Sequence, residues 1–379
     1  MPGKKILLFG NANHQFNINY VKWLRRKYDN VEIDILSDRP AKEATHSFYD
    51  HTYEINFKSL FFRLIKQIPI LGNIYSRLIL ISNIRDISKY DFIHIQTLNL
   101  HAAYFALFVK KYCDSRLIVS IWGSDYYTHS KKHRNIFYKS CNLADRITFT
   151  NEQTRDHFTK EFNWEKDNVS ICRFGLTPLE GLKRMRHQRR KEVKRLLGWD
   201  ASRIAITIGY NLSLNQQHLQ ILQEFTNLTE YADQIELILP ITYGGNQKYK
   251  NELLSVLEGL PFRYFVYDQF LSDEAVSQIR WASDIMVQLQ RTDQFSGSML
   301  EHLFARNVVV TGSWLPYQTM INEGIKFEEI DGIHELSDVL KNVLSDYDKF
   351  YQTTVANDEV VLRLCSWENN ILSWIQLYN

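Results

Sequence analysis

Residues 285–311 read IMVQLQRTDQFSGSMLEHLFARNVVVT. The first four residues form a short apolar run typical of a buried strand, and residues 308–311 form another. Between them, a small polar loop around Ser296, Gly297 and Ser298 leads into a helical pattern. A strand, a helix and a second strand in this order predict a parallel βαβ unit, because parallel strands need a long crossover connection.

The same alternation of apolar runs and helical segments extends along the rest of the chain. Further strands are predicted at residues 6–9, 31–36, 92–95, 117–122, 146–150, 169–172, 204–208, 237–239 and 264–267. Repeated βα units predict an α/β protein with two doubly wound, Rossmann-like domains. We place these domains at 1–178 and 195–355, separated by a basic stretch, and predict a helical tail over 356–379.

Composition excludes several classes of protein. The chain has 379 residues, of which 45% are hydrophobic and 23% charged, so intrinsic disorder is excluded. Four scattered cysteines without C-x-x-C spacing favour a reducing compartment over a zinc ribbon or disulfide framework. No signal peptide is visible, and no apolar run reaches the roughly 20 residues that a membrane-spanning helix needs. We expect a cytoplasmic protein.

The charge is distributed unevenly. Residues 1–200 carry 34 Lys and Arg against 20 Asp and Glu, whereas residues 201–379 carry 11 against 23. The basic half predicts an anionic partner: nucleic acid, anionic lipid or a phosphorylated acceptor. Residues 57–85 are apolar, aromatic and basic, which suits peripheral docking on the inner face of the plasma membrane; alternatively they form a core helix and a lid. The basic run at 183–195 is either a solvated helix face or a phosphate-binding segment.

The loop before the helix at 296–304 is a candidate anion site. Ser296, Gly297 and Ser298 place backbone N–H groups at a helix start, which suits a diphosphate. The alternative is a capping box, in which Ser298 and Glu301 only close the helix start.

Asp293 and Glu301 lie eight residues apart. This spacing resembles the E-x7-E signature of retaining GT-B glycosyltransferases of the family 4-like group, with Asp in the first position. The following residues 305–310 resemble the family's A-x-G-x-P-V-I strand, with Asn307 for the glycine and Val309 for the proline. The resemblance implies that the first acid lies near the donor sugar and that the second contacts the ribose of the nucleotide.

Other stretches resemble further parts of this family in the same order, namely 122–125, 143–147, 173–176, 270–274, 314–317 and 366–368. The resemblance implies a GT-B architecture, with two domains facing a cleft and a C-terminal helix crossing back to the first domain. It further implies a UDP-, GDP- or dTDP-sugar donor, no permanently bound cofactor and no metal. The implied acceptor is a lipid-linked or polysaccharide precursor in bacterial surface-glycan synthesis, such as O-antigen or capsule.

One departure from the family concerns the diphosphate. The family usually carries an Arg and a Lys after the first strand of the second domain, but residues 209–218 read GYNLSLNQQH. The diphosphate would instead be held by backbone groups, by one of these polar side chains, or by a nearby cation. The candidates are Gly209, Tyr210, Asn211, His218 and Arg291, with Tyr243 and Gly244 in a second loop facing the same cleft.

Two residues of the first domain are candidate catalytic groups. His14 follows the first strand, where clefts form in doubly wound sheets, and would contact the donor or the acceptor; alternatively it is merely solvated. Asp125 could orient or deprotonate an acceptor hydroxyl, because a carboxylate is a plausible base there; alternatively it caps the following turn.

Two other functions remain open at the level of sequence. One is a nucleotide-sugar epimerase or hydrolase of the same fold. The other is a nucleic-acid-binding protein that uses the basic half. We expect no nucleic acid, because the basic run lacks interleaved aromatic residues and no RNP-type strand is recognisable.

Overall fold

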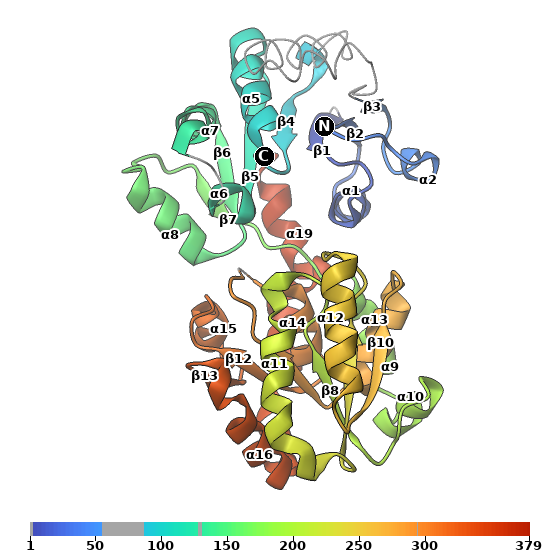
Figure 1. Ribbon diagram of the computed structural model, residues 1–379. Coiled ribbons are helices and arrows are strands. Elements are labelled where there is room, and N and C mark those ends of the chain that lie inside the picture. The colour runs from blue at the N-terminus through green and yellow to red at the C-terminus, as the bar shows by residue number, and fades with distance from the viewer. Residues whose placement is uncertain (1–2, 55–86, 128–130, 294) are drawn as a thin grey trace. The chain divides into compact units, whose positions relative to one another are not determined.

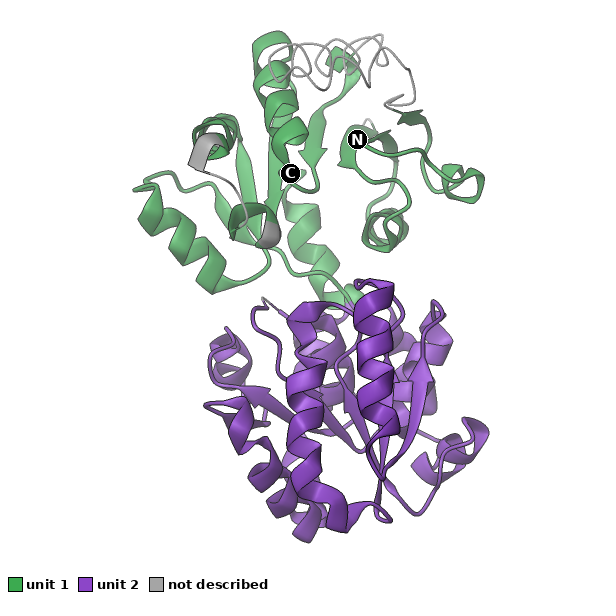
Figure 2. Cartoon of the chain, viewed as in Figure 1, with its two compact units in different colours: residues 1–175, 367–379 green, residues 176–366 purple. Residues whose placement is uncertain are grey.

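The computed structural model describes residues 3–54, 87–127, 131–293 and 295–379. It divides into two compact units, which Figure 2 colours separately: unit 1 is residues 1–175 with 367–379, and unit 2 is residues 176–366. The segment 57–85, for which membrane docking was predicted, lies outside the described residues.

Unit 1 is built on a parallel sheet. Its described strands have the order β3-β2-β1-β4-β5-β6-β7. They are β1 (Lys4–Gly10), β2 (Val31–Ser37), β3 (Thr52–Glu54), β4 (Phe92–Ile95), β5 (Arg116–Ile121), β6 (Arg146–Phe149) and β7 (Val169–Ile171). The order reverses between β1 and β4, which is the switch point where doubly wound sheets bind ligands.

Helices flank this sheet (Figure 1). They are α1 (Gln15–Lys27), α2 (Glu43–His46), η1 (Ile87–Lys89), α5 (Leu100–Tyr112), α6 (Ser124–Tyr127), α7 (Lys131–Leu143), α8 (Glu152–Glu161) and α19 (Trp367–Gln376). Successive residues of β1 belong to different apolar clusters, as alternation along a strand requires. Leu7 shares a cluster with Phe105 of α5, whereas Leu8 shares one with Tyr20 of α1 and Trp374 of α19.

A chain of buried polar groups links these elements. The Tyr20 and Tyr378 hydroxyls lie 2.5 Å apart, and His94 Nδ1 lies 2.6 Å from the Tyr378 hydroxyl. His94 Nε2 lies 2.8 Å from Ser120 Oγ on the neighbouring strand. Burial lowers the pKa of His94 to about 3, so its ring is neutral in the folded protein.

Unit 2 repeats the same topology. Its strand order is β10-β9-β8-β11-β12-β13, and every pair is parallel. The strands are β8 (Ile204–Ile208), β9 (Ile235–Pro240), β10 (Arg263–Tyr267), β11 (Ile285–Gln288), β12 (Val308–Gly312) and β13 (Glu328–Ile330). The switch point of this sheet lies between β8 and β11.

Helices cover both faces of this second sheet (Figure 1). They are α9 (Pro178–Met185), α10 (Arg190–Leu196), η2 (Leu214–Gln216), α11 (His218–Phe225), η3 (Thr226–Tyr231), α12 (Gln247–Glu258), α13 (Asp273–Ala282), α14 (Gly297–Phe304), α15 (Gln318–Asn322), η4 (Ile333–Glu335), α16 (Leu336–Ser345), α17 (Tyr347–Thr354) and α18 (Asn357–Cys365). Ile206 of β8 lies in one cluster with Phe225 of α11. Ala205 lies in another with Val193 of α10 and Ile279 of α13.

The basic stretch near residue 190 is helical and belongs to unit 2, whereas the sequence suggested a break between domains. Arg186 forms an ion pair with Asp358 at 2.8 Å. Arg190 and Lys194 both form ion pairs with Asp284. These cations are therefore counterions of buried carboxylates in unit 2, which disfavours a phosphate-binding role for them.

The C-terminal region also differs from the prediction of one helix over 356–379. Ser366 has extended backbone angles (φ −77°, ψ 142°) and separates α18 from α19. Serine favours helix ends because its hydroxyl competes for backbone groups. The chain passes from unit 2 to unit 1 after this residue.

Two strands were not predicted from sequence. β3 and β13 read TYE and EEI, so no apolar run marks them, unlike the equally short β7. The doubly wound α/β fold class itself is confirmed. Among the described residues, no helix has the length and apolar character needed to cross a bilayer.

Candidate functional site

The first candidate site is the switch point of unit 2, where the loops after β8 and β11 meet. Asn215 Nδ2 donates to Gln290 Oε1 and to the Thr292 carbonyl oxygen, at 2.8 Å each. Gln217 Nε2 donates to the Leu289 carbonyl oxygen at 2.7 Å. Gln217 itself has a left-handed backbone with φ 59°. These bonds fasten the two loops together at the carboxyl ends of their strands.

Gly209 directly follows β8 at this switch point. Its φ of 63° is in the left-handed region, where a side chain is disfavoured. A Cβ atom there would lie 2.7 Å from Gln216 Oε1 and 3.0 Å from His218 Nε2. Glycine is therefore required both by the backbone and by the two side chains that converge on it.

A second loop, after β9, contacts the first. The backbone N–H of Leu212 donates to the Tyr243 carbonyl oxygen at 2.6 Å. Gly244 has φ 92°, and a Cβ atom there would lie 3.5 Å from Asn211 Oδ1. That oxygen already accepts a hydrogen bond from the backbone N–H of Ser213. The structure thus brings together the loops that carry Gly209, Tyr210, Asn211, Tyr243 and Gly244.

Asp293 lies in the loop between β11 and α14. Its Oδ2 accepts hydrogen bonds from Gln290 Nε2 at 3.2 Å and from the Tyr317 hydroxyl at 2.5 Å. Burial, together with the negative charge of Asp293, raises the pKa of Tyr317 well above its usual value. Burial raises the pKa of Tyr210 as well, with Asp293 as the second cause. Both phenols therefore stay protonated, and the hydroxyl of Tyr317 donates to Asp293 as a neutral group.

The start of α14 corrects one alternative drawn from sequence. The N-cap is Ser296, whose Oγ accepts a hydrogen bond from the Met299 backbone N–H at 3.2 Å. Ser298 therefore lies inside the first turn, and a capping box between Ser298 and Glu301 is wrong. Ser296 Oγ also accepts a hydrogen bond from Gln288 Nε2 at 3.2 Å, which ties the helix start to β11.

Glu301 is a buried carboxylate with a buried partner. It is 8% exposed, and its Oε2 lies 3.2 Å from Nε of Arg280, which is 5% exposed. Burial raises the pKa of Glu301, and the Arg280 guanidinium opposes that effect. Arg291, in the loop after β11, is in contrast exposed.

The second candidate site is a pocket of about 380 Å³ at the switch point of unit 1. The lining residues are Phe9, Gly10, Asn11, His14, Phe16, Asn17, Asp38, Arg39, Thr97, Asn99 and Trp122. Burial lowers the pKa of His14, and the charge of Arg39 lowers it further. Burial raises the pKa of Asp38. Asp38 Oδ1 and Asn17 Oδ1 are both buried without a hydrogen-bond partner.

Asp125 lies behind this pocket rather than in its lining. Its Oδ1 accepts hydrogen bonds from the backbone N–H groups of Trp122 and Gly123, at 2.9 Å each, and its Oδ2 accepts one from Leu98 at 3.2 Å. It is 7% exposed, and burial raises its pKa against the effect of these bonds. The carboxylate fixes the loop that carries Trp122.

Sequence reasoning missed several residues of these sites. Asp38 and Arg39 directly follow β2, so their position after a parallel strand was the available signal. Gln216 lies in the same loop as His218 but has no pattern of its own. Tyr317 is 24 residues from Asp293 and is brought to it only by the fold.

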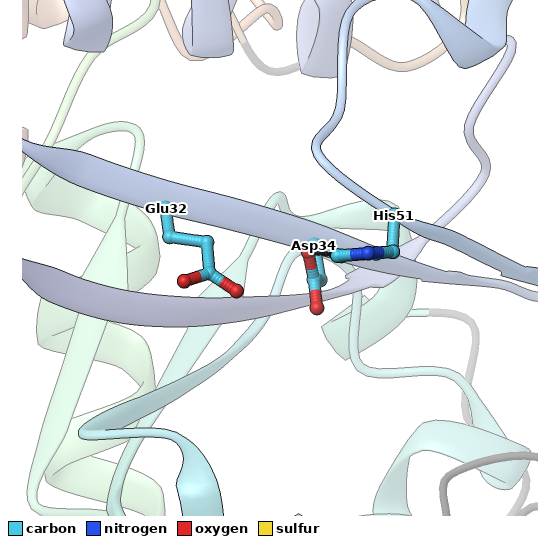
Figure 3. Close-up of side chains that lie close together, drawn as sticks. All are labelled: Glu32, Asp34 and His51. Atoms are coloured by element: carbon cyan, nitrogen blue, oxygen red, sulfur yellow. Dashed lines mark hydrogen bonds and ion pairs between the residues drawn. The ribbon is translucent and has the colours of Figure 1, made fainter.

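A third cluster lies at the β2–β3 edge of unit 1, where Figure 3 shows Glu32, Asp34 and His51 close together. One ligand atom of each lies within 4.8 Å of the others, although the sequence showed no metal-type spacing. Lys5 Nζ lies 2.9 Å from Glu32, and Lys89 Nζ lies 3.4 Å from Asp34. Because ammonium groups already neutralise both carboxylates, we interpret the trio as part of an ion-pair cluster.

Comparison with known proteins supports the resemblance inferred from sequence. Residues 5–151 match the family model described as glycosyl transferase 4-like. Over its whole length the chain has the GT-B fold. No curated protein matches its sequence.

Solved structures similar to this chain share its fold over nearly the whole length. The HepE protein of Anabaena, in complex with UDP and glucose, is 14% identical, with 99% of each chain covered and a TM-score of 0.69. Sucrose-phosphate synthase of Thermosynechococcus elongatus is 12% identical, with 99% of this chain and 98% of that chain covered and a TM-score of 0.71. The N-terminal domain of trehalose-6-phosphate phosphatase from Candida albicans is 11% identical, covers 99% and 96%, and has a TM-score of 0.74. At these identities the likeness shows the fold.

Proposed function

We propose that this glycosyltransferase moves a sugar from a nucleoside diphosphate sugar to a hydroxyl group of a saccharide acceptor. The observation that carries the proposal is the convergence of three loops and the start of α14 at the switch point of unit 2. This is the position at which doubly wound sheets bind nucleotides. The solved relative HepE, described with UDP and glucose, supports this choice of donor.

The donor half of the reaction is assigned to unit 2. The backbone N–H groups of Gly297 and Ser298 at the start of α14 suit the leaving diphosphate, because a helix N-terminus favours negative charge. Asp293 stabilises the positive charge that develops on the donor sugar in an oxocarbenium-like transition state. Glu301 accepts a hydrogen bond from a ribose hydroxyl, while Arg280 keeps its carboxylate ionised.

The acceptor half is assigned to the pocket of unit 1. Asp38 and Asn17 each present a buried oxygen without a donor, and the hydroxyl groups of a sugar supply such donors. Trp122 lines the same pocket and offers an apolar ring face to a sugar ring. A neutral His14 can accept a proton from the attacking hydroxyl, since its pKa is lowered. Asp125 acts here as a positioning residue for Trp122.

The finer aspects of this function extend the same proposal. The acceptor is a lipid-linked or polysaccharide precursor for a bacterial surface glycan such as O-antigen or capsule. The basic, apolar segment 57–85 holds the enzyme at an anionic membrane surface. Transfer proceeds with retention of anomeric configuration and without a metal. The anomeric outcome is read by NMR spectroscopy of the first-formed product.

The test is a thermal-shift panel with UDP, GDP, dTDP, CDP and CMP, with NAD as a control. A ligand at 100 times its dissociation constant stabilises the folded state by about 2.7 kcal/mol, which gives a clear shift in melting temperature. We expect a selective shift with one nucleoside diphosphate, which names the base of the donor. A flat response to all of them would contradict the proposed donor. Release of free sugar from the donor, without transfer, would instead indicate a hydrolase.

A further inference from the structure

The switch point of unit 2 contains a group of buried polar atoms without partners. Neither amide atom of Gln216 has a partner in hydrogen-bond geometry, although Tyr210 lies beside it. His218 Nε2 and Gln288 Oε1 also have no partner. Gln216 is 1% exposed, and His218 and Gln288 are 0% exposed. A buried polar group without a partner is costly, so a set of them at one ligand-binding edge points to a polar ligand.

The direction of the His218 donor follows from its neighbour. The Tyr249 hydroxyl lies 3.3 Å from His218 Nδ1. Burial lowers the pKa of His218 and keeps its ring neutral, so one ring nitrogen accepts a hydrogen bond, and we assign the Tyr249 hydroxyl as the donor to Nδ1. A histidine that accepts at Nδ1 carries its proton on Nε2. The Nε2–H group therefore points to Gly209, where a Cβ atom would lie 3.0 Å away.

We infer that Gln216 and His218 bind the diphosphate of the donor through uncharged N–H groups, in place of a cation. This inference rests on the proposed function and assigns the residues that contact the donor diphosphate. Their loop, residues 209–218, contains no Lys or Arg. The amide N–H of Gln216 and the ring N–H of His218 supply hydrogen bonds to phosphate oxygens. Gly209 has no side chain at the point where Gln216 and His218 converge.

The alternative source of positive charge is Arg291, which follows β11 and is exposed. The two arrangements differ in their response to salt. An exposed guanidinium is screened by ions, so an affinity for the diphosphate that depends on Arg291 falls as ionic strength rises. An affinity that depends on buried, neutral donors changes little. Salt dependence of binding thus separates the two arrangements.

The experiment compares nucleoside diphosphates with their nucleosides. UDP, GDP and dTDP are each titrated in parallel with uridine, guanosine and thymidine, against wild type, Gln216→Met and His218→Phe. We expect each variant to lose about 10- to 100-fold in affinity for the diphosphate and to keep its affinity for the nucleoside. His218→Gln, which retains an N–H near the same place, should recover most of the loss. Arg291→Met should bind like wild type.

Stability provides a second readout that a structural role would not produce. Replacing an unpartnered buried polar group by an apolar one of similar shape is neutral or stabilising. The melting temperature of Gln216→Met without ligand should therefore equal or exceed that of wild type, whereas His218→Phe also loses the bond between His218 Nδ1 and the Tyr249 hydroxyl and should be less stable. Gln318→Met and His334→Phe, at exposed positions, serve as matched controls.

The outcomes distinguish the inference from the function on which it rests. If no diphosphate binds the wild type, the proposed function fails and the inference fails with it. If a diphosphate binds but its ratio of affinity to the nucleoside is unchanged in Gln216→Met and His218→Phe, only the inference is overturned. Strong salt dependence with loss of binding in Arg291→Met would overturn it in favour of the guanidinium.

Discussion

At the residue scale, Asp293 is the acidic group that the proposed chemistry depends on most. The Tyr317 hydroxyl and the Gln290 amide both donate to its Oδ2, so its position is set by two neighbours. We expect Asp293→Asn to lower kcat about 100-fold, while the affinity for the nucleoside diphosphate changes less than threefold. Steady-state rates and equilibrium titration measure the two quantities. A variant with normal turnover would remove Asp293 from the site.

Glu301 forms a buried ion pair with Arg280, so substituting Glu301 also affects Arg280. Removing one member of a buried ion pair leaves an uncompensated charge, which costs about 3–5 kcal/mol. Glu301→Ala should therefore lower the free energy of unfolding by about that amount, whatever its role in binding. Urea denaturation measures the loss. The double variant Glu301→Leu with Arg280→Met should recover most of the stability; if it does not, the pair is not the cause.

At the element scale, α19 is an integral part of unit 1. Trp374 is 1% exposed, lies 5.3 Å from the Tyr20 ring by centroids, and donates from Nε1 to the Arg173 carbonyl oxygen at 2.8 Å. Trp374→Ala should destabilise the protein by about 3–5 kcal/mol, because a large side chain is lost from a closed cluster. Leu372, which is 54% exposed on the same helix, is the matched control. An equal effect of Leu372→Ala would argue against this packing.

The membrane docking proposed for residues 57–85 can be tested separately. Reversing the charges of Lys58, Arg63 and Lys66 to Glu should abolish co-sedimentation with vesicles that contain anionic lipid. Each basic residue near such a surface contributes about 1 kcal/mol to binding. The control reverses Lys22, Lys27 and Lys42 in the described part of unit 1. Equal binding of the Lys58 variant and wild type would favour the alternative of a core helix and lid.

At the scale of the whole molecule, buried neutral histidines predict sensitivity to acid. Burial lowers the pKa of His94 to about 3 and that of His218 to about 4, and lowers that of His302 well below its usual value. The unfolded chain binds these protons near pH 6.5, so stability is complete above that pH and is lost as pH falls toward the folded values. Each residue should cost roughly 2 kcal/mol at pH 5 relative to pH 7.5.

Urea titrations at several pH values measure this loss. His94→Gln should reduce the slope of stability against pH below 6.5. His334→Gln, at a position whose side chain is 81% exposed, should leave the slope unchanged. A slope that is the same in wild type and His94→Gln would mean that His94 does not titrate as its burial requires.

Sequence alone determined the fold class. Apolar runs of three to six residues between helical patterns are local features, and they predicted the central strands of both sheets, such as those near Ile6 and Ile285. The order of short motifs around Asp293 and Glu301 led to the glycosyltransferase family. Edge strands such as Thr52–Glu54 were missed because their polar and charged residues form no apolar run.

Only the tertiary structure decided how the polar residues pair. Whether Glu301 serves a helix cap or an ion pair depends on Arg280, which reaches it from a different helix. Tyr317 reaches Asp293 from another loop, 24 residues along the chain, and Gln216 and His218 converge on Gly209 because their common loop folds back on itself. Such contacts have no local sequence signal, because their energy depends on burial and distance, which are set only when the sheet and its helices are assembled.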